Sequence, residues 1–193
     1  IDLHGLAEGP AKIITSDISQ NDSAIFPSPN GENLAILGPW GEFSIYNTWQ
    51  GTFVEAALSS LGGGDLFFNW YPDNHRILWE SGSLVLSDPF SGTHTLLAVP
   101  GYGEVNAAAS SPDGQFVVYT YDTDLIYPRG LWIVNTNGQN AHLLSKDVTF
   151  SNNLVWSPDG KRIAFYGYGW QVIDSDGSNL RELAPGVIIP QCH

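Results

Sequence analysis

Short apolar runs separated by polar turns recur in pairs along the chain, and this pattern predicts β-strands. The runs are too short for helices and rich in β-branched and aromatic residues. No stretch keeps an apolar period of about 3.6 residues, so the pattern fits no helical repeat. The first run of each pair is Leu34–Leu37, Ile77–Trp79, Phe116–Tyr119 or Ile163–Tyr166, and the second is Phe43–Tyr46, Leu84–Leu86, Leu131–Val134 or Val172–Ile173.

A four-residue turn motif precedes the first run of every pair. Its copies begin 43, 40 and 46 residues apart: Ser28-Pro29-Asn30-Gly31, Tyr71-Pro72-Asp73-Asn74, Ser111-Pro112-Asp113-Gly114 and Ser157-Pro158-Asp159-Gly160. Proline followed by Asp or Asn and then Gly is typical of tight reverse turns, in which the Asp side chain bonds nearby amides. A period in the forties fits a propeller blade.

Each repeat contains four predicted strands, which is the number in a propeller blade. A second turn with Asn or Asp and a later Gly follows the second run, and then comes a further strand: Phe53–Leu58, Thr95–Val99, His142–Leu144 or Leu180–Leu183. An apolar or aromatic strand precedes each first turn, where Trp70 and Trp156 are expected to pack between blades. We therefore predict an all-β propeller of about four blades in a single domain, residues 1–193. It divides into a partial blade at 1–19, which holds strands near Asp2–Gly5 and Ala11–Thr15, and blades at 20–60, 61–100, 101–146 and 147–193.

Composition narrows the classes of partner. The net charge is −13, from 7 basic and 20 acidic residues, so the surface repels phosphate backbones and nucleic acid is not expected as a partner. No apolar run approaches the roughly 18 residues of a spanning helix, so no direct membrane span is predicted. The chain has no Met, which indicates processing or a piece of a longer protein.

The repeats resemble those of the TolB-like β-propeller family, which is related to the WD-type repeat. The resemblance covers almost the whole chain and is strongest at Trp156–Phe165 followed by Ile173–Leu183, and at Leu131–Gly138. Units one and two depart from it, with Pro27 in the Trp position and Tyr71 in the Ser position. The resemblance implies a partner-binding, gating, lyase or scaffold role, because one propeller fold serves all of these.

Three arrangements of the blades remain open at this stage. The chain is a four-bladed ring, a fragment of a larger propeller, or a half-ring completed by another copy or chain. The family resemblance implies rings of six to eight blades. An open ring would expose the flanks of its terminal blades, which favours association.

Few residues suggest catalysis or metal binding. The segment Asp174–Asn179 resembles the start of a calcium loop, in which Asp174, Asp176 and Asn179 would be ligands, but Leu183 stands where the loop needs Glu. A hairpin turn is the better interpretation, and Ca²⁺ is the alternative; we predict no other cofactor. The five His residues show no metal-ligand spacing, and we predict that His94 and His142 lie exposed on outer strands. Cys192 is the only cysteine. No Gly-x-Ser-x-Gly nucleophile motif occurs, so no catalytic residues are predicted.

The connections on one face of the propeller carry the candidate binding residues. These connections join the second strand of a blade to the third, and one blade to the next. The longest runs from Tyr121 to Gly130, and loops carry function more often than the strands they join. Exposed aromatic residues beside acids suit a protein interface. We predict partner binding through Trp40, Tyr102, Asp122, Asp124, Tyr127, Arg129, Tyr168 and Trp170.

The sequence therefore predicts a noncatalytic interaction or scaffold module of a periplasmic, cell-envelope or extracellular assembly. Its partner would be a protein, a larger complex or another copy of itself. The alternative is a propeller associated with an enzyme, either as the gating domain of a prolyl oligopeptidase-like hydrolase or as a carbohydrate-binding or carbohydrate-active propeller.

Overall fold

The computed structural model describes residues 24–38, 42–57, 68–80, 83–97, 99, 103–122, 129–146, 148, 153–166 and 169–183. Within these ranges the chain forms sixteen strands and no helix, and so none that could span a membrane. The strands are β1 (Ala24–Pro27), β2 (Asn33–Leu37), β3 (Phe43–Asn47), β4 (Thr52–Val54), β5 (Phe68–Trp70), β6 (Ile77–Glu80), β7 (Leu84–Asp88), β8 (Thr93–Leu96), β9 (Glu104–Ser110), β10 (Phe116–Asp122), β11 (Gly130–Asn135), β12 (His142–Ser145), β13 (Leu154–Trp156), β14 (Arg162–Tyr166), β15 (Trp170–Asp174) and β16 (Arg181–Glu182).

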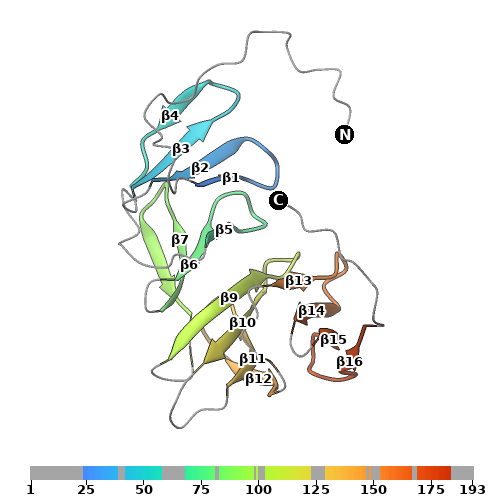
Figure 1. Ribbon diagram of the computed structural model, residues 1–193. Helices are drawn as coiled ribbons and strands as arrows, with labels where there is room; N and C mark the ends of the chain where they lie inside the picture. Colours follow the sequence, from blue (N-terminus) through green and yellow to red (C-terminus); the bar gives the residue numbers. More distant parts are fainter. Residues whose placement is uncertain are drawn as a thin grey trace, which may run out of the picture.

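These strands form four antiparallel sheets, each made of four consecutive strands in sequence order. We call them the first (β1–β4), second (β5–β8), third (β9–β12) and fourth (β13–β16) sheets. They follow one another along an arc, with the first and fourth at its two ends (Figure 1). Neighbouring sheets touch through their inner strands, because β1 contacts β5, β6 contacts β9, and β9 contacts β13. This all-β architecture of four-stranded blades is the one predicted from the repeat.

The turn motif forms the first hairpin of each sheet, as its residue types require. In the third sheet the Gly114 amide donates to the Ser111 carbonyl (2.9 Å), and the Asp113 carboxylate accepts from the Gln115 amide (3.1 Å). Gly114 has a φ of 67°, a left-handed conformation that favours glycine. The second sheet has Asn74 at this position with a φ of 62°, which asparagine tolerates better than most residues. The prediction that Asp73, Asp113 and Asp159 form turns is confirmed.

Apolar side chains fill the three joints between neighbouring sheets. Each sheet turns one face back toward the sheet before it and the other forward toward the sheet after it. The first joint buries Ile45 against Trp70 and Ile77, and the other two joints hold equivalent clusters. Trp70 and Trp156 are both buried at joints, so their predicted packing role is confirmed.

Some strand ends differ from the sequence prediction. The strand expected at Phe53–Leu58 is observed at Thr52–Val54, because the Ala57 amide leaves its own sheet and donates to the Pro89 carbonyl of the second sheet (2.8 Å). The last strand of the second sheet begins at Thr93 rather than at Thr95. The predicted strands near Asp2–Gly5 and Ala11–Thr15 lie outside the described residues, and the division into domains stays a prediction.

Candidate functional site

The consecutive antiparallel order gives the propeller two different faces. In every sheet, the hairpins that join the first strand to the second and the third strand to the fourth lie on one face, which we call the turn face. The connections from the second strand of a sheet to its third strand, and from one sheet to the next, lie on the opposite face, which we call the loop face. Asp122, Arg129 and Trp170 stand where strands meet the loop face, at the end of β10, just before β11 and at the start of β15.

Asp122 and Arg129 form an ion pair across the base of the longest connection. The Arg129 Nε lies 2.6 Å from Asp122 Oδ1, and the Asp122 side chain is largely buried while that of Arg129 is half-exposed. Asp122 is also the strand neighbour of Glu104 on β9, so two acidic residues stand side by side with one guanidinium nearby. The ion pair therefore links the end of β10 to the residue before β11. Because Arg129 balances only one of the two carboxylates, this edge of the sheet keeps a negative charge.

The recess beside this ion pair is too small for an organic ligand. Asn106, Thr120 and Tyr121 line it together with both partners of the pair, and its volume is about 10 Å³. That is room for about one water molecule.

Trp170 packs against Tyr166, a residue that the sequence interpretation did not select. The two rings meet edge to face with centroids 5.5 Å apart, and Tyr166 remains 45% exposed. They face each other because Tyr166 ends β14 and Trp170 begins β15, and the two residues are register partners. The sequence offered one clue to this role of Tyr166. At the equivalent position of the third repeat stands Thr120, so the aromatic residue is specific to the fourth repeat.

The other predicted partner-binding residues cannot be placed. Trp40, Tyr102, Asp124, Tyr127 and Tyr168 lie outside the described residues. The structure thus brings together Asp122 with Arg129, and Trp170 with Tyr166, on the edges of neighbouring sheets. The whole predicted surface stays a prediction.

The segment Asp174–Asn179 forms a tight hairpin turn closed by its own side chains. Asn179 Nδ2 donates to Asp174 Oδ2 (2.7 Å), and Asp176 Oδ1 accepts from both the amide and the hydroxyl of Ser178 (2.9 and 2.6 Å). These contacts occupy oxygens that a calcium ion would need. In the described part of the chain, no three His, Cys, Asp or Glu side chains are grouped so that they could hold a metal.

One hydrogen-bonded chain of side chains went unnoticed in the sequence. Trp79 Nε1 donates to Ser87 Oγ (2.7 Å), and Ser87 Oγ lies 2.7 Å from His94 Nδ1. A serine beside a histidine resembles a nucleophile and its base, but Ser87 is fully buried and no substrate could reach it. These hydrogen bonds instead give partners to the polar side chains beneath the outer strand β8. His94 and His142 are exposed, as predicted.

Turn carboxylates on the turn face have lowered pKa values. The Ser111 hydroxyl and the Gln115 amide hold the pKa of Asp113 below its usual value, and the Ser157 hydroxyl with the Lys161 amide does the same for Asp159. The hydroxyl and amide of Ser178 lower the pKa of Asp176. These hydrogen bonds favour the charged carboxylate because it accepts more strongly than the neutral acid.

Acid should therefore destabilise the fold. The folded pKa values lie below the unfolded value of about 4, so this stabilisation is complete above that value and is lost as the pH falls through the folded values. We expect the urea midpoint of unfolding to fall between about pH 6 and pH 3. The triple variant Asp113→Asn, Asp159→Asn, Asp176→Asn should show a flatter fall, because it removes three carboxylates that titrate in this range. Its turns should still form, since Asn30 already accepts the equivalent hydrogen bond in the first turn. An equally steep fall in the variant would assign the acid sensitivity to other groups.

Comparison with known proteins supports the fold and leaves the function open. No protein-family model matches the chain, and no curated protein is similar to it. Solved structures do match. TolB from Acinetobacter baumannii aligns with a TM-score of 0.66 and 17% identity over 89% of this chain and 45% of that one. A TolB candidate from Agrobacterium tumefaciens aligns with a TM-score of 0.59 and 21% identity over 83% of this chain and 63% of that one.

An enzyme also shares this architecture. Oligogalacturonate lyase from Vibrio parahaemolyticus aligns with a TM-score of 0.63 and 12% identity over 86% of this chain and 55% of the lyase. The chain spans less than two thirds of each of these three structures. At such low identities the likeness concerns the fold alone, and it confirms the predicted resemblance. The chain therefore has the β-propeller fold of the TolB structures, built from four-stranded antiparallel blades.

Proposed function

We propose that the chain is a noncatalytic interaction module that binds a protein partner through its loop face. The observation that carries this proposal is the pairing of Tyr166 with Trp170 at the loop-face end of the fourth sheet, which follows the sheet that holds the ion pair of Asp122 and Arg129. Aromatic residues that are partly exposed and held rigid contribute much of the binding energy at protein interfaces, and Arg contributes with them. A fixed aromatic pair therefore supplies an anchor at little cost in conformational entropy.

The charge of the loop face selects the class of partner. Glu42, Glu80, Glu104 and Asp122 stand at this edge in three of the four described sheets, and the whole chain carries a net charge of −13. Such a surface attracts basic segments and speeds their association at low salt. The proposed partner is a protein with a basic, partly apolar segment, in a periplasmic, cell-envelope or extracellular assembly.

Partner capture with matched variants tests this proposal. Trp170→Ala is expected to weaken capture of a partner from the native host at least about tenfold, because truncating an anchor residue costs about 2 kcal/mol or more. Asp122→Asn should weaken it less and reduce its dependence on salt. Trp49→Ala is the control, since Trp49 is an exposed aromatic residue on the turn face. Equal capture by all variants would place the interface elsewhere.

A carbohydrate-binding propeller is the second candidate. The edge-to-face pair of Tyr166 and Trp170 offers an aromatic surface of the kind sugars stack on, and the lyase similarity is compatible with it. Calorimetric titration with oligogalacturonate distinguishes the two proposals. Binding that is lost in Trp170→Ala would favour the sugar, and no heat of binding would leave the protein partner.

A further inference from the structure

Hydrogen bonds from aromatic side chains cross from one sheet to the inner strand of the sheet before it. Trp70 Nε1 donates to the Phe26 carbonyl of β1 (2.8 Å), and Trp156 Nε1 donates to the Ala109 carbonyl of β9 (3.1 Å). These bonds join the first sheet to the second and the third sheet to the fourth. The inner strands of neighbouring sheets are therefore tied together within the chain.

The second and third sheets are joined by a bond in the opposite direction. Ser110 stands where the second and fourth sheets have Trp70 and Trp156, so this joint has no tryptophan donor. Tyr71 of the second sheet instead donates from its hydroxyl to the Gly114 carbonyl of the third (2.6 Å). Burial raises the pKa of Tyr71 to about 12, which keeps the hydroxyl protonated at neutral pH. The strands at the other side of each sheet, β4, β8, β12 and β16, form the outer rim.

Three of these four outer strands are protected against pairing with a further strand. β4 has three residues, and its chain then crosses to the second sheet at Ala57. The register of β12 on β11 shifts between Leu143 and Ser145. β16 consists of the charged residues Arg181 and Glu182 alone. Short length, irregular register and charge are common ways in which proteins protect sheet edges.

The outer strand β8 has none of these protections. Its four residues, Thr93–Leu96, pair with β7 in an unbroken register, and they include no Pro, Lys, Arg, Asp or Glu. Two of them are threonines, which favour extended backbone. Thr93, His94 and Leu96 are exposed, Leu96 by 68%. Among the outer strands of the described sheets, β8 is therefore the most open to pairing.

The outward backbone groups of β8 follow from its register. The Leu97 amide donates to the Leu84 carbonyl that precedes Val85 of β7 (2.9 Å). Backbone groups of alternate residues point the same way in an antiparallel pair, so those of Thr95 also face β7. Those of His94 and Leu96 point away from the sheet. Among the described residues, neither of these two amides has a hydrogen-bond partner.

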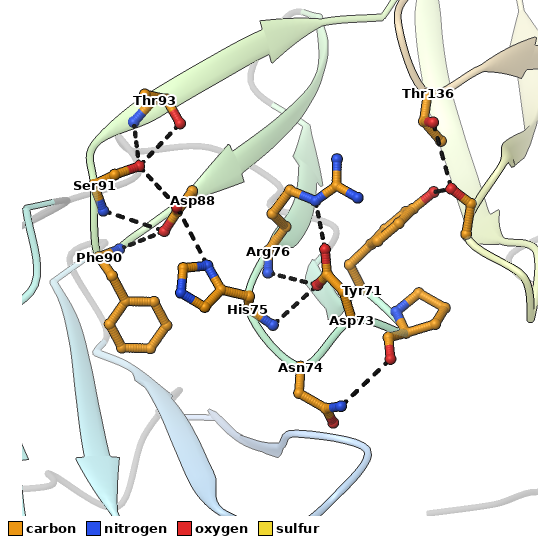
Figure 2. Close-up of polar contacts among 12 residues, drawn as sticks. Tyr71, Asp73, Asn74, His75, Arg76, Asp88, Phe90, Ser91, Thr93 and Thr136 are labelled. Carbon is orange, nitrogen blue, oxygen red and sulfur yellow. Dashed lines mark hydrogen bonds and ion pairs between the residues drawn. The ribbon is translucent and has the colours of Figure 1, made fainter.

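Side-chain hydrogen bonds hold β8 in place at its start and along its length. Asp88 Oδ2 accepts from the Ser91 hydroxyl (2.7 Å), and Ser91 Oγ also lies 3.0 Å from Thr93 Oγ1 (Figure 2). Along the strand, His94 Nδ1 lies 2.7 Å from the Oγ of buried Ser87 on β7. A partner would therefore pair with a strand that is already ordered, which limits the entropy lost on binding.

The third sheet limits how far a partner strand could extend along β8. An added Cβ at Gly138 would lie 2.6 Å from the Leu96 carbonyl oxygen, so the outer turn of the third sheet lies against this carbonyl. The open stretch offers the amide and carbonyl of His94 and the amide of Leu96. We call these three groups the β8 edge. It has room for a short single strand rather than for the edge of another folded sheet.

We propose that an extended peptide segment of a partner protein pairs with the β8 edge as a fifth strand of the second sheet. Such a segment supplies the backbone acceptors and donor that the edge requires. An apolar or β-branched residue of the peptide covers the Leu96 side chain. The net charge of −13 repels a second copy of this chain and favours a neutral or basic segment. This surface lies on the outer rim and is separate from the loop face.

Binding of a synthetic strand to the full chain tests this proposal. The probe is a peptide in which threonine and valine alternate, with a lysine at each end. Titrated up to about 5 mM, a range that includes the weak affinities of short peptides, it should bind saturably and slow hydrogen exchange at the amides of His94 and Leu96. The control peptide has the same side chains and methylated backbone nitrogens. It cannot donate backbone hydrogen bonds and should not bind.

Three variants locate the binding site. Leu96→Pro removes the outward amide and should weaken binding at least about tenfold, because the peptide carbonyl opposite it loses its donor. Leu96→Thr keeps this amide and the tendency to form a strand, so its affinity should stay within about threefold of that of the unmodified chain. Phe53→Pro changes the position on β4 that is equivalent to His94 and should leave binding unchanged.

Several results would overturn the proposal. They are no binding of the probe, equal binding of the methylated peptide, retained binding in Leu96→Pro, and equal loss in Phe53→Pro. A dimer of the chain that Leu96→Pro abolishes would assign the β8 edge to a second copy instead. If Leu96→Pro does not fold, the two peptides still decide the question, because methylation removes backbone hydrogen bonds from the partner's side.

Discussion

Replacing Trp70 by alanine is expected to lower the free energy of unfolding by about 3–5 kcal/mol. Trp70 is 3% exposed and packs with Ile45 and Ile77 in the joint between the first two sheets. Truncation removes a large apolar contact, opens a cavity and deletes the hydrogen bond to the Phe26 carbonyl. Equilibrium unfolding in urea measures the change, because the midpoint shifts with stability when the slope is constant.

Two control variants separate the causes of that loss. Trp70→Phe keeps an aromatic ring and removes the N–H donor, so it should cost about 1–3 kcal/mol, part of it from the Phe26 carbonyl that loses its donor. Trp49→Ala deletes an equally large side chain at an exposed turn and should change stability by no more than about 0.5 kcal/mol. A small effect of Trp70→Ala, similar to that of Trp49→Ala, would contradict the role assigned to the first joint.

The repeat made most of the blade architecture predictable from sequence. Proline followed by Asp or Asn and then Gly or Asn favours a reverse turn whatever surrounds it, so these motifs located the first hairpin of each sheet. Trp70 and Trp156 could be assigned to packing because they stand at the same repeat position. The end of β4 could not be predicted, because it depends on the bond from the Ala57 amide to the second sheet, a contact between distant segments.

Side-chain pairs across a joint or a hairpin were the least predictable part of the site. The bond from Tyr71 to Gly114 replaces a missing Trp, and only the placement of two sheets reveals it. The pairing of Tyr166 with Trp170 needed the register of β14 on β15, which the intervening glycines did not specify. Turns can therefore be predicted from local sequence, whereas contacts that depend on how neighbouring sheets pack cannot.

Gly138→Ala is expected to destabilise the fold by about 2–4 kcal/mol, because two penalties add at this position. Gly138 has a φ of 79°, where an L-residue with a Cβ is strained. An added Cβ would also lie 2.6 Å from the Leu96 carbonyl oxygen of the second sheet, and backbone cannot move aside as a flexible side chain can. The substitution should therefore loosen the joint between the second and third sheets.

Gly31→Ala isolates the first penalty, the conformational strain. Gly31 has a similar φ of 73°, but a Cβ there meets no atom within 4 Å, so only the conformational strain of roughly 1–2 kcal/mol applies. Urea unfolding of both variants beside the unmodified chain gives the comparison. A larger loss at Gly138 than at Gly31 measures how closely the third blade's outer turn is held against the second blade. Equal losses would mean that the turn at Gly138 can move away from Leu96 at little cost. The inner strands and the aromatic hydrogen bonds would then hold the second and third sheets together.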